Sequence, residues 1–198
     1  MKSVTIVGQF YPDLEQFDWD YQYEFGEIWM LNAFFDYYPK ASPDRIYQIH
    51  AEDTKNLPSI QRMEQVYNNY DAIVKTSYPH GGRIKNESII DKKFYEDKYG
   101  VENLSCTICI MFYEAIEYGA EEITLLGVFL NSREYKYQAP GIIKAIKTAR
   151  EKGIKVYIDQ IREWELFCKA EDALKLKIHP SNGYWNMMSN HPKESLFK

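Results

Sequence analysis

The stretch GVFLNSREYKYQAPG, residues 127–141, carries side chains that together could hold a planar, charged small molecule. The guanidinium of Arg133 could neutralise a phosphate, and the carboxamide of Gln138 could hydrogen-bond to a base or a sugar. In an extended segment alternate residues face the same side, so Tyr135 and Tyr137 would form an aromatic wall for stacking. The alternative is a loop that only packs on its own domain. This combination makes nucleotide binding the first hypothesis.

Two residues, His50 and Glu134, are candidates for acid–base chemistry. A general acid or base needs a titratable side chain within reach of the substrate, and both residue types meet that need. His50 follows a strand-like run, RIYQI, so it is alternatively a ligand donor or a satisfied histidine at a strand end. Glu52, Asp53 and Asp159 could instead hold Mg²⁺, but no spacing requires a metal, and we predict none.

Short apolar runs alternate with amphipathic stretches along most of the chain. The runs predict strands at 4–7, 27–31, 45–49, 72–75, 122–126 and 155–158. Helical spacing predicts helices at 59–70, 87–99, 107–118, 140–152 and 161–177. This alternation favours an α/β domain with a mostly parallel sheet and helices on both faces. We expect that domain to span residues 1–165, and a C-terminal helix with an irregular, extended tail to span 166–198.

The residues that follow the expected strands form one candidate patch, because ligands bind beyond the carboxyl ends of parallel strands. Ser105 and Thr107 join the patch from a helix start, where hydroxyls and free N–H groups either bind an anion or only cap the helix. Asn32 either reads the edge of a base or sugar or caps the segment after it. The ligand-binding candidates are Gly8, Gln9, Asn32, His50, Ser105, Thr107, Gly127, Val128, Arg133, Glu134, Tyr135, Tyr137 and Gln138.

Two common phosphate-binding motifs are missing from the sequence. Gly8 follows the first strand, but VGQFYPDLEQF is not G-x-G-x-x-G, and no G-x-x-x-x-G-K-[ST] occurs. We therefore predict no dinucleotide cofactor, and no cofactor of any other kind. The turn YPHGGRIKN, with Gly81 and Gly82 beside His80, Arg83 and Lys85, either wraps an anion or is a solvated surface turn.

Composition narrows the classes of partner. The net charge is −5, with 24 Lys and Arg against 29 Asp and Glu, which disfavours a nucleic-acid partner. No run of about 18 apolar residues is present, so we expect no membrane span. Three cysteines and no secretory segment indicate a cytoplasmic protein with reduced thiols. We interpret Cys106 and Cys109, a C-x-x-C pair, as small residues on a helix face, and a redox or metal role is the alternative.

The sequence resembles a group of small phage-encoded Rossmann-like proteins. The matching features are Gly8, Leu31–Asn32, His50, Thr107, Gly127–Val128, Glu134–Tyr135, Tyr137–Gln138, Pro140 and Gly153–Tyr157. More remotely, the layout is similar to bacterial sialyltransferases that use CMP-sialic acid and to the MptE-like pyrophosphokinase group. The resemblance implies a nucleotide-shaped pocket lined by Asn32, His50, Thr107 and residues 127–138. The chain departs from the pattern at Phe129, where an aspartate is expected, and it has no histidine within 128–140.

Two hypotheses of different classes follow. In the first, a phage protein in the host cytoplasm binds a nucleotide or nucleotide-derived molecule and sequesters an immune signal of the host. Such a protein is expected to be a homo-oligomer, with the aromatic segment FDWDYQYEFGEIW, residues 17–29, either at the interface or packed in the core. In the second, the chain is a metal-independent enzyme of glycosyltransferase-like or other nucleotide-processing type, with His50 or Glu134 as the acid–base residue. The sequence slightly favours binding.

Overall fold

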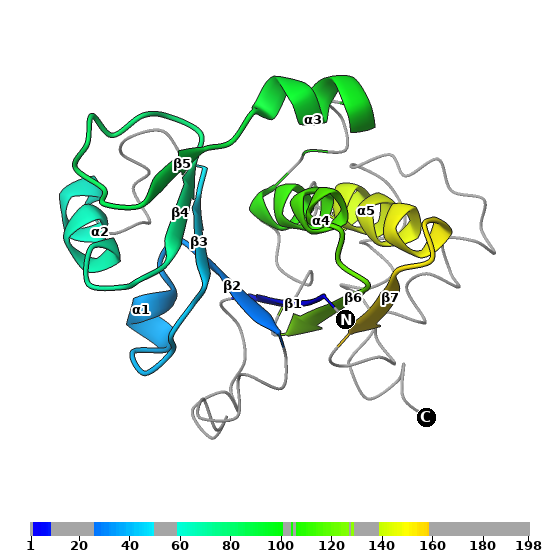
Figure 1. The fold of residues 1–198 in the computed structure, drawn as a ribbon, viewed down its shortest axis with the longest axis horizontal. Coiled ribbons are helices and arrows are strands. Elements are labelled where there is room, and N and C mark those ends of the chain that lie inside the picture. The colour runs from blue at the N-terminus through cyan, green and yellow to red at the C-terminus, as the bar shows by residue number, and fades with distance from the viewer. Residues whose placement is uncertain are drawn as a thin grey trace, which may run out of the picture.

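A computed structural model of the chain describes residues 2–8, 26–49, 59–100, 104, 106–126, 128 and 139–158. Within these ranges seven strands form one parallel sheet in the order β5-β4-β3-β2-β1-β6-β7 (Figure 1). The strands are β1 Ser3–Val7, β2 Glu27–Leu31, β3 Arg45–Gln48, β4 Ile73–Thr76, β5 Glu87–Ile89, β6 Glu122–Leu126 and β7 Lys155–Ile158. The predicted α/β class with a parallel sheet is confirmed.

Helices cover both faces of the sheet, as predicted. They are α1 Phe34–Tyr37, α2 Ile60–Tyr67, α3 Lys92–Tyr99, α4 Thr107–Tyr118 and α5 Ala139–Glu151. Figure 1 shows α1 and α2 on one side of the sheet and α4 and α5 on the other. The α3 helix packs onto α4, where the rings of Tyr99 and Tyr113 are stacked with centroids 4.0 Å apart.

The strands are buried on both faces, which explains their continuous apolar runs. In β2, Ile28 and Met30 belong to the core cluster under α1 and α2, whereas Trp29 belongs to the larger cluster under α4 and α5. The α4 helix is buried along most of its length, and it ends at Gly119, whose φ of 77° a side chain would rarely adopt. The sequence signals for these elements therefore agree with their packing.

The order of the strands reverses at β1. From β1 the chain adds β2, β3, β4 and β5 on one side, and it then returns to place β6 and β7 on the other. β1 and β6 pair from Ser3↔Glu122 to Val7↔Leu126, so their carboxyl ends lie level with each other. The pair is the topological switch point of the sheet, which is where doubly wound sheets hold their ligands.

One predicted element is wrong. Residues 87–99 were expected to form a single helix, but they divide into β5 and α3. Residues 87–89 form β5 and pair with β4 from Val74↔Glu87 to Thr76↔Ile89. Asp91 then caps α3 by accepting a hydrogen bond from Phe94 N at 2.9 Å. The pairing is a tertiary contact that local periodicity does not encode. The predicted helix at 161–177, the tail and most of segment 17–29 lie outside the described residues.

Candidate functional site

The carboxyl ends of β1 and β6 form the centre of the candidate site. Gly8 N donates a hydrogen bond to Leu126 O at 2.8 Å, so the two strands stay joined up to the point where both chains leave the sheet. Val128, two residues beyond β6, packs against the core cluster under α4 and α5. Gly8 and Val128 therefore follow the two strands that pair at the switch point, and a role of either in binding stays a prediction.

Thr107 reaches the same edge from α4. This helix ends at Tyr118, four residues before β6 begins, so its last turn lies at the amino edge of the sheet and its first turn at the carboxyl edge. Thr107 is the first helical residue and is buried, after an extended N-cap at Cys106 with φ −160° and ψ 170°. The first N–H groups of a helix have no partner within the helix, and they point toward this edge.

Asn32 also lies at the carboxyl edge, on the side of α1 and α2, and its polar atoms bond within the protein. Its Nδ2 donates to Gln48 Oε1 at 3.1 Å, and its Oδ1 accepts from Ala33 N at 2.8 Å. Its backbone oxygen accepts from Tyr67 Oη at 2.8 Å. The residue is buried; its side chain ties the turn after β2 to β3, and its backbone oxygen ties the turn to α2. The predicted cap is not formed, because the N-cap of α1 is Ala33 and no side chain caps this helix. A contact of Asn32 with a ligand stays a prediction.

A second polar cluster lies between α2 and the turn after β4; the sequence pointed to His80 and Arg83 in this turn but not to their carboxylate partners. Glu64 of α2 lies with its Oε1 2.8 Å from Nδ1 of His80 and 3.0 Å from Nε of Arg83. The backbone N of His80 donates to the Glu87 carboxylate at 3.0 Å, and Thr76 Oγ1 donates to the same oxygen at 3.0 Å. The turn that begins after β4 is therefore fixed at both its start and its middle.

The imidazole of His80 is oriented by a carboxylate, which is an arrangement that suits proton transfer. Its side chain is 7% exposed and that of Glu64 is 8% exposed. The Glu64 carboxylate therefore fixes the orientation of the ring through Nδ1. A histidine oriented in this way can transfer a proton when its other ring nitrogen reaches a substrate. The signal in the sequence was His80 beside Gly81–Gly82, but nothing marked Glu64 as its partner.

A buried ionic network holds α4, and with it Thr107, against the sheet. Arg45 lies with its Nε 2.9 Å from Glu27 Oε2 and its Nη1 3.2 Å from Glu114 Oε1, and Lys75 Nζ lies 2.6 Å from the same Glu114 oxygen. Two carboxylates and two cations make the cluster neutral. Glu114 is on α4, and its partners Arg45 and Lys75 are on β3 and β4, so the network fixes the position of this helix.

The network has the expected effect on acidity. Burial by itself raises the pKa of Glu27, but hydrogen bonds to its carboxylate more than offset this and lower the pKa, the donors being Tyr118, Trp29 and Arg45. Burial also opposes the charge of Arg45, yet its anionic neighbours leave the pKa of its guanidinium raised. Both groups are therefore charged in the folded protein near neutral pH.

The remaining predicted site residues lie outside the described residues. They are Gln9, His50, Ser105, Gly127, Arg133, Glu134, Tyr135, Tyr137 and Gln138. Of the predicted set, the structure thus places Gly8, Asn32, Thr107 and Val128, and it puts all four at the carboxyl edge. Within the described ranges no group of three or more His, Cys, Asp or Glu residues is arranged to hold a metal ion.

Comparison with known proteins gives one weak likeness. No protein-family model matches the chain, and no curated protein matches it. One solved structure similar to it is the sialyltransferase CstII from Campylobacter jejuni in complex with a substrate analogue, cytidine-5'-monophosphate, at a TM-score of 0.48 and 17% identity over 80% of this chain and 79% of that chain. A likeness at this level leaves the site and its ligand to be argued from the chain's own residues. None of the helices in the described part of the chain is long and apolar enough to span a membrane.

Proposed function

We propose that this chain binds a nucleotide or a nucleotide-derived small molecule at the carboxyl ends of β1 and β6. The observation that carries the proposal is the reversal of strand order at this pair, where Gly8 and Leu126 are joined by a hydrogen bond. Doubly wound sheets bind ligands in the crevice beyond such a reversal. The absence of a glycine-rich dinucleotide motif favours a mononucleotide or a derivative of one.

The first turn of α4 would hold the phosphate. The N–H groups at the start of the helix and the positive end of its dipole attract an anion, and the hydroxyl of Thr107 can donate one further hydrogen bond. The residues of the 127–138 stretch, which follow β6 directly, would supply the guanidinium of Arg133 and the rings of Tyr135 and Tyr137. In this arrangement the phosphate lies near α4 and the base stacks on the tyrosines.

Isothermal titration of the full chain with a panel of nucleoside mono-, di- and triphosphates tests the proposal. Thr107→Val removes a hydroxyl while keeping the side-chain shape, and a lost hydrogen bond to a charged group costs about 1.5–3 kcal/mol, or roughly a 10- to 150-fold weaker Kd. The matched control is Thr148→Val in α5, whose hydroxyl donates to Lys144 O at 2.9 Å toward the amino edge. Equal affinities for both variants, or no nucleotide bound by the parent chain, would reject this site.

The finer proposal is sequestration, which is supported by the resemblance of the sequence to phage-encoded proteins. A sequestering protein holds its ligand without changing it. The chain is loaded with the nucleotide that binds best, heated to release it, and the released compound is analysed by mass spectrometry. An unchanged mass is expected, and a chemically altered product would exclude a role limited to binding.

The Glu64–His80 pair favours a second candidate function, that of a nucleotide-processing enzyme. The pair joins α2 to the turn after β4 with 2.8 Å between Glu64 Oε1 and His80 Nδ1, and it can act as a general acid or base. His80→Gln is then expected to lower the hydrolysis of a nucleotide-sugar about 10²- to 10⁴-fold, the usual contribution of such a group. Tyr78→Phe is the control, because Tyr78 lies in the same turn and is 54% exposed. Undiminished turnover by the His80 variant would remove this role.

A further inference from the structure

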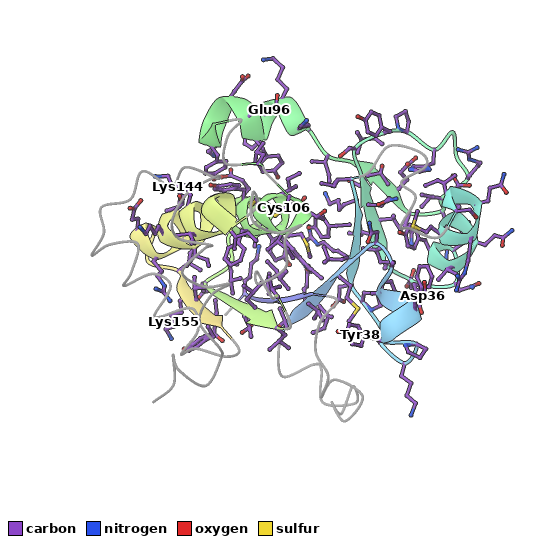
Figure 2. The ribbon with its side chains drawn as sticks, turned by 180° about the vertical axis from the view of Figure 1, so that it is seen from behind. Asp36, Tyr38, Glu96, Cys106, Lys144 and Lys155 are labelled. Carbon is purple, nitrogen blue, oxygen red and sulfur yellow. The ribbon has the colours of Figure 1, made fainter. Side chains whose placement is uncertain are left out.

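Two cysteines lie in contact at the start of α4. The sulfurs of Cys106 and Cys109 are 3.4 Å apart, close enough for one thiol to donate a hydrogen bond to the other. Neither cysteine forms a disulfide in this structure, and Figure 2 labels Cys106 at α4. The spacing of three residues places one at the N-cap of the helix and the other in its first turn. The sequence alone could not tell this arrangement from two small residues on one helix face.

The two thiols differ in their surroundings. Cys106 is 8% exposed and has an extended backbone outside the helix, whereas Cys109 is fully buried. The positive end of the helix dipole and a neighbouring thiol both stabilise a thiolate at the N-cap. Cys106 therefore has the position of an attacking thiol and Cys109 that of a resolving thiol.

We propose that Cys106 and Cys109 form a reversible dithiol–disulfide site that reacts with small-molecule disulfides. A disulfide bond joins sulfurs about 2.05 Å apart, so the pair must close by roughly 1.4 Å. The movement falls mainly on Cys106, because it lies at the N-cap with an extended backbone, and the bond that its carbonyl accepts from Ile110 N is long, at 3.4 Å. Cys109 stays in the buried first turn of α4.

The reaction balances in two exchange steps. The Cys106 thiolate attacks one sulfur of a small-molecule disulfide, forms a mixed disulfide and releases one small thiolate. The Cys109 thiolate then attacks the sulfur of Cys106 and releases the second small thiolate. Two protein thiols are oxidised, one external disulfide is reduced to two thiols, and the two protons go to the released thiolates. A dithiol reductant reverses both steps.

Closure of the disulfide fixes the N-cap of α4, next to Thr107. The proposal itself does not depend on nucleotide binding, since its readouts are covalent. If the proposed phosphate site is also correct, oxidation changes nucleotide affinity, and the two proposals can fail separately.

The experiment uses the full chain with Cys168→Ser, so that Cys106 and Cys109 are the two remaining thiols. After incubation of the folded protein with oxidised glutathione, intact mass is expected to fall by two hydrogen atoms, free thiols are expected to disappear, and dithiothreitol is expected to restore both. Peptide mapping should show the Cys106–Cys109 link. Persistence of both thiols in the folded protein, or a disulfide between two chains, would overturn the proposal.

Single variants test the assigned roles of the two thiols. In the same background, Cys109→Ala is expected to accumulate a stable glutathione adduct at Cys106, and Cys106→Ala to remain unmodified because its remaining thiol is buried. Circular dichroism confirms that each variant is folded, and Cys109→Ser replaces Cys109→Ala if that variant does not fold. Equal modification of both variants would show that the thiols are not an attacking and resolving pair.

Discussion

Replacing Gly26 by alanine is expected to destabilise the fold by pushing β1 and β2 apart. Gly26 immediately precedes β2, and its φ is 75°, in the left-handed region. A Cβ at this position would lie 2.1 Å from the backbone oxygen of Ser3 and 2.6 Å from its carbonyl carbon. Backbone atoms at the start of a central strand cannot rotate away from the added methyl group. The start of β1, or the turn into β2, must therefore move by about 1 Å to restore van der Waals contact.

Two contributions make up the expected decrease in the free energy of unfolding. A left-handed backbone costs alanine about 1–2 kcal/mol relative to glycine, and overpacking of this kind costs about 1–3 kcal/mol. The sum, about 2–5 kcal/mol, corresponds to a decrease in Tm on the order of 10 °C for a domain of this size. Gly81→Ala is the matched control, because Gly81 has a φ of 62° and nothing lies within 4 Å of an added Cβ. Gly81→Ala should therefore be destabilised only by the cost of the left-handed backbone.

Urea denaturation followed by circular dichroism measures both variants against the parent chain. Gly26→Ala should lower the free energy of unfolding by about 1–3 kcal/mol more than Gly81→Ala does. If the two variants are equally stable, the close approach of Gly26 to Ser3 does not constrain the sheet, and the reasoning fails.

Two further predictions concern the supports of the site. Because the pKa of Glu27 is lower in the folded state than the ordinary value of 4.5, its contribution to stability is present above that value and is lost as the pH falls through the folded-state pKa. Urea denaturation between pH 3 and 6 should therefore show that acidification lowers the free energy of unfolding less for Glu27→Gln than for the parent chain. The same dependence of this free energy on pH in both proteins would contradict the assignment. Tyr67→Phe leaves the buried oxygen of Asn32 without its 2.8 Å donor and should cost about 1–3 kcal/mol, while Tyr78→Phe, at an exposed ring, should cost almost nothing in the same chemical denaturation. A loss of equal size for both tyrosines would mean that the turn at Asn32 does not need this hydrogen bond.

The α4 helix connects the structural and chemical features of the molecule. Its third turn carries Glu114, which pairs with Arg45 and Lys75, and its first turn carries Thr107 between Cys106 and Cys109. A charged pair buried away from water is costly to break on one side. The helix is thus held firmly near the amino edge while its start remains at the edge where we propose that the ligand binds.

The strands and helices were largely predictable because their signals are local. The β2, α4, β6 and β7 elements have the predicted bounds. Their signals, helical spacing and β-branched runs, depend only on the residues within each element. The exception is the 87–99 stretch, where a three-residue strand at the edge of the sheet has no periodicity of its own. Its pairing with β4 decided its structure.

The site was only partly predictable. The chain order of strands and helices indicated that Gly8, Thr107 and Val128 lie at the carboxyl edge of the sheet, and a common role of these residues in binding stays a prediction. The sequence also singled out Asn32, but only the fold shows that its carboxamide bonds to Gln48, sixteen residues away.

The sequence by itself therefore determined the type of fold, because the fold follows from local hydrophobic periodicity, and it predicted a polar patch at the carboxyl edge from the rule for parallel strands. The tertiary structure alone decided which side chains meet: Glu64 with His80, Arg45 with Glu114, and Cys106 with Cys109 at 3.4 Å. The physical reason is that such contacts depend on strand order, register and the rotation of each helix. These are set by the packing of the whole core and not by any single segment.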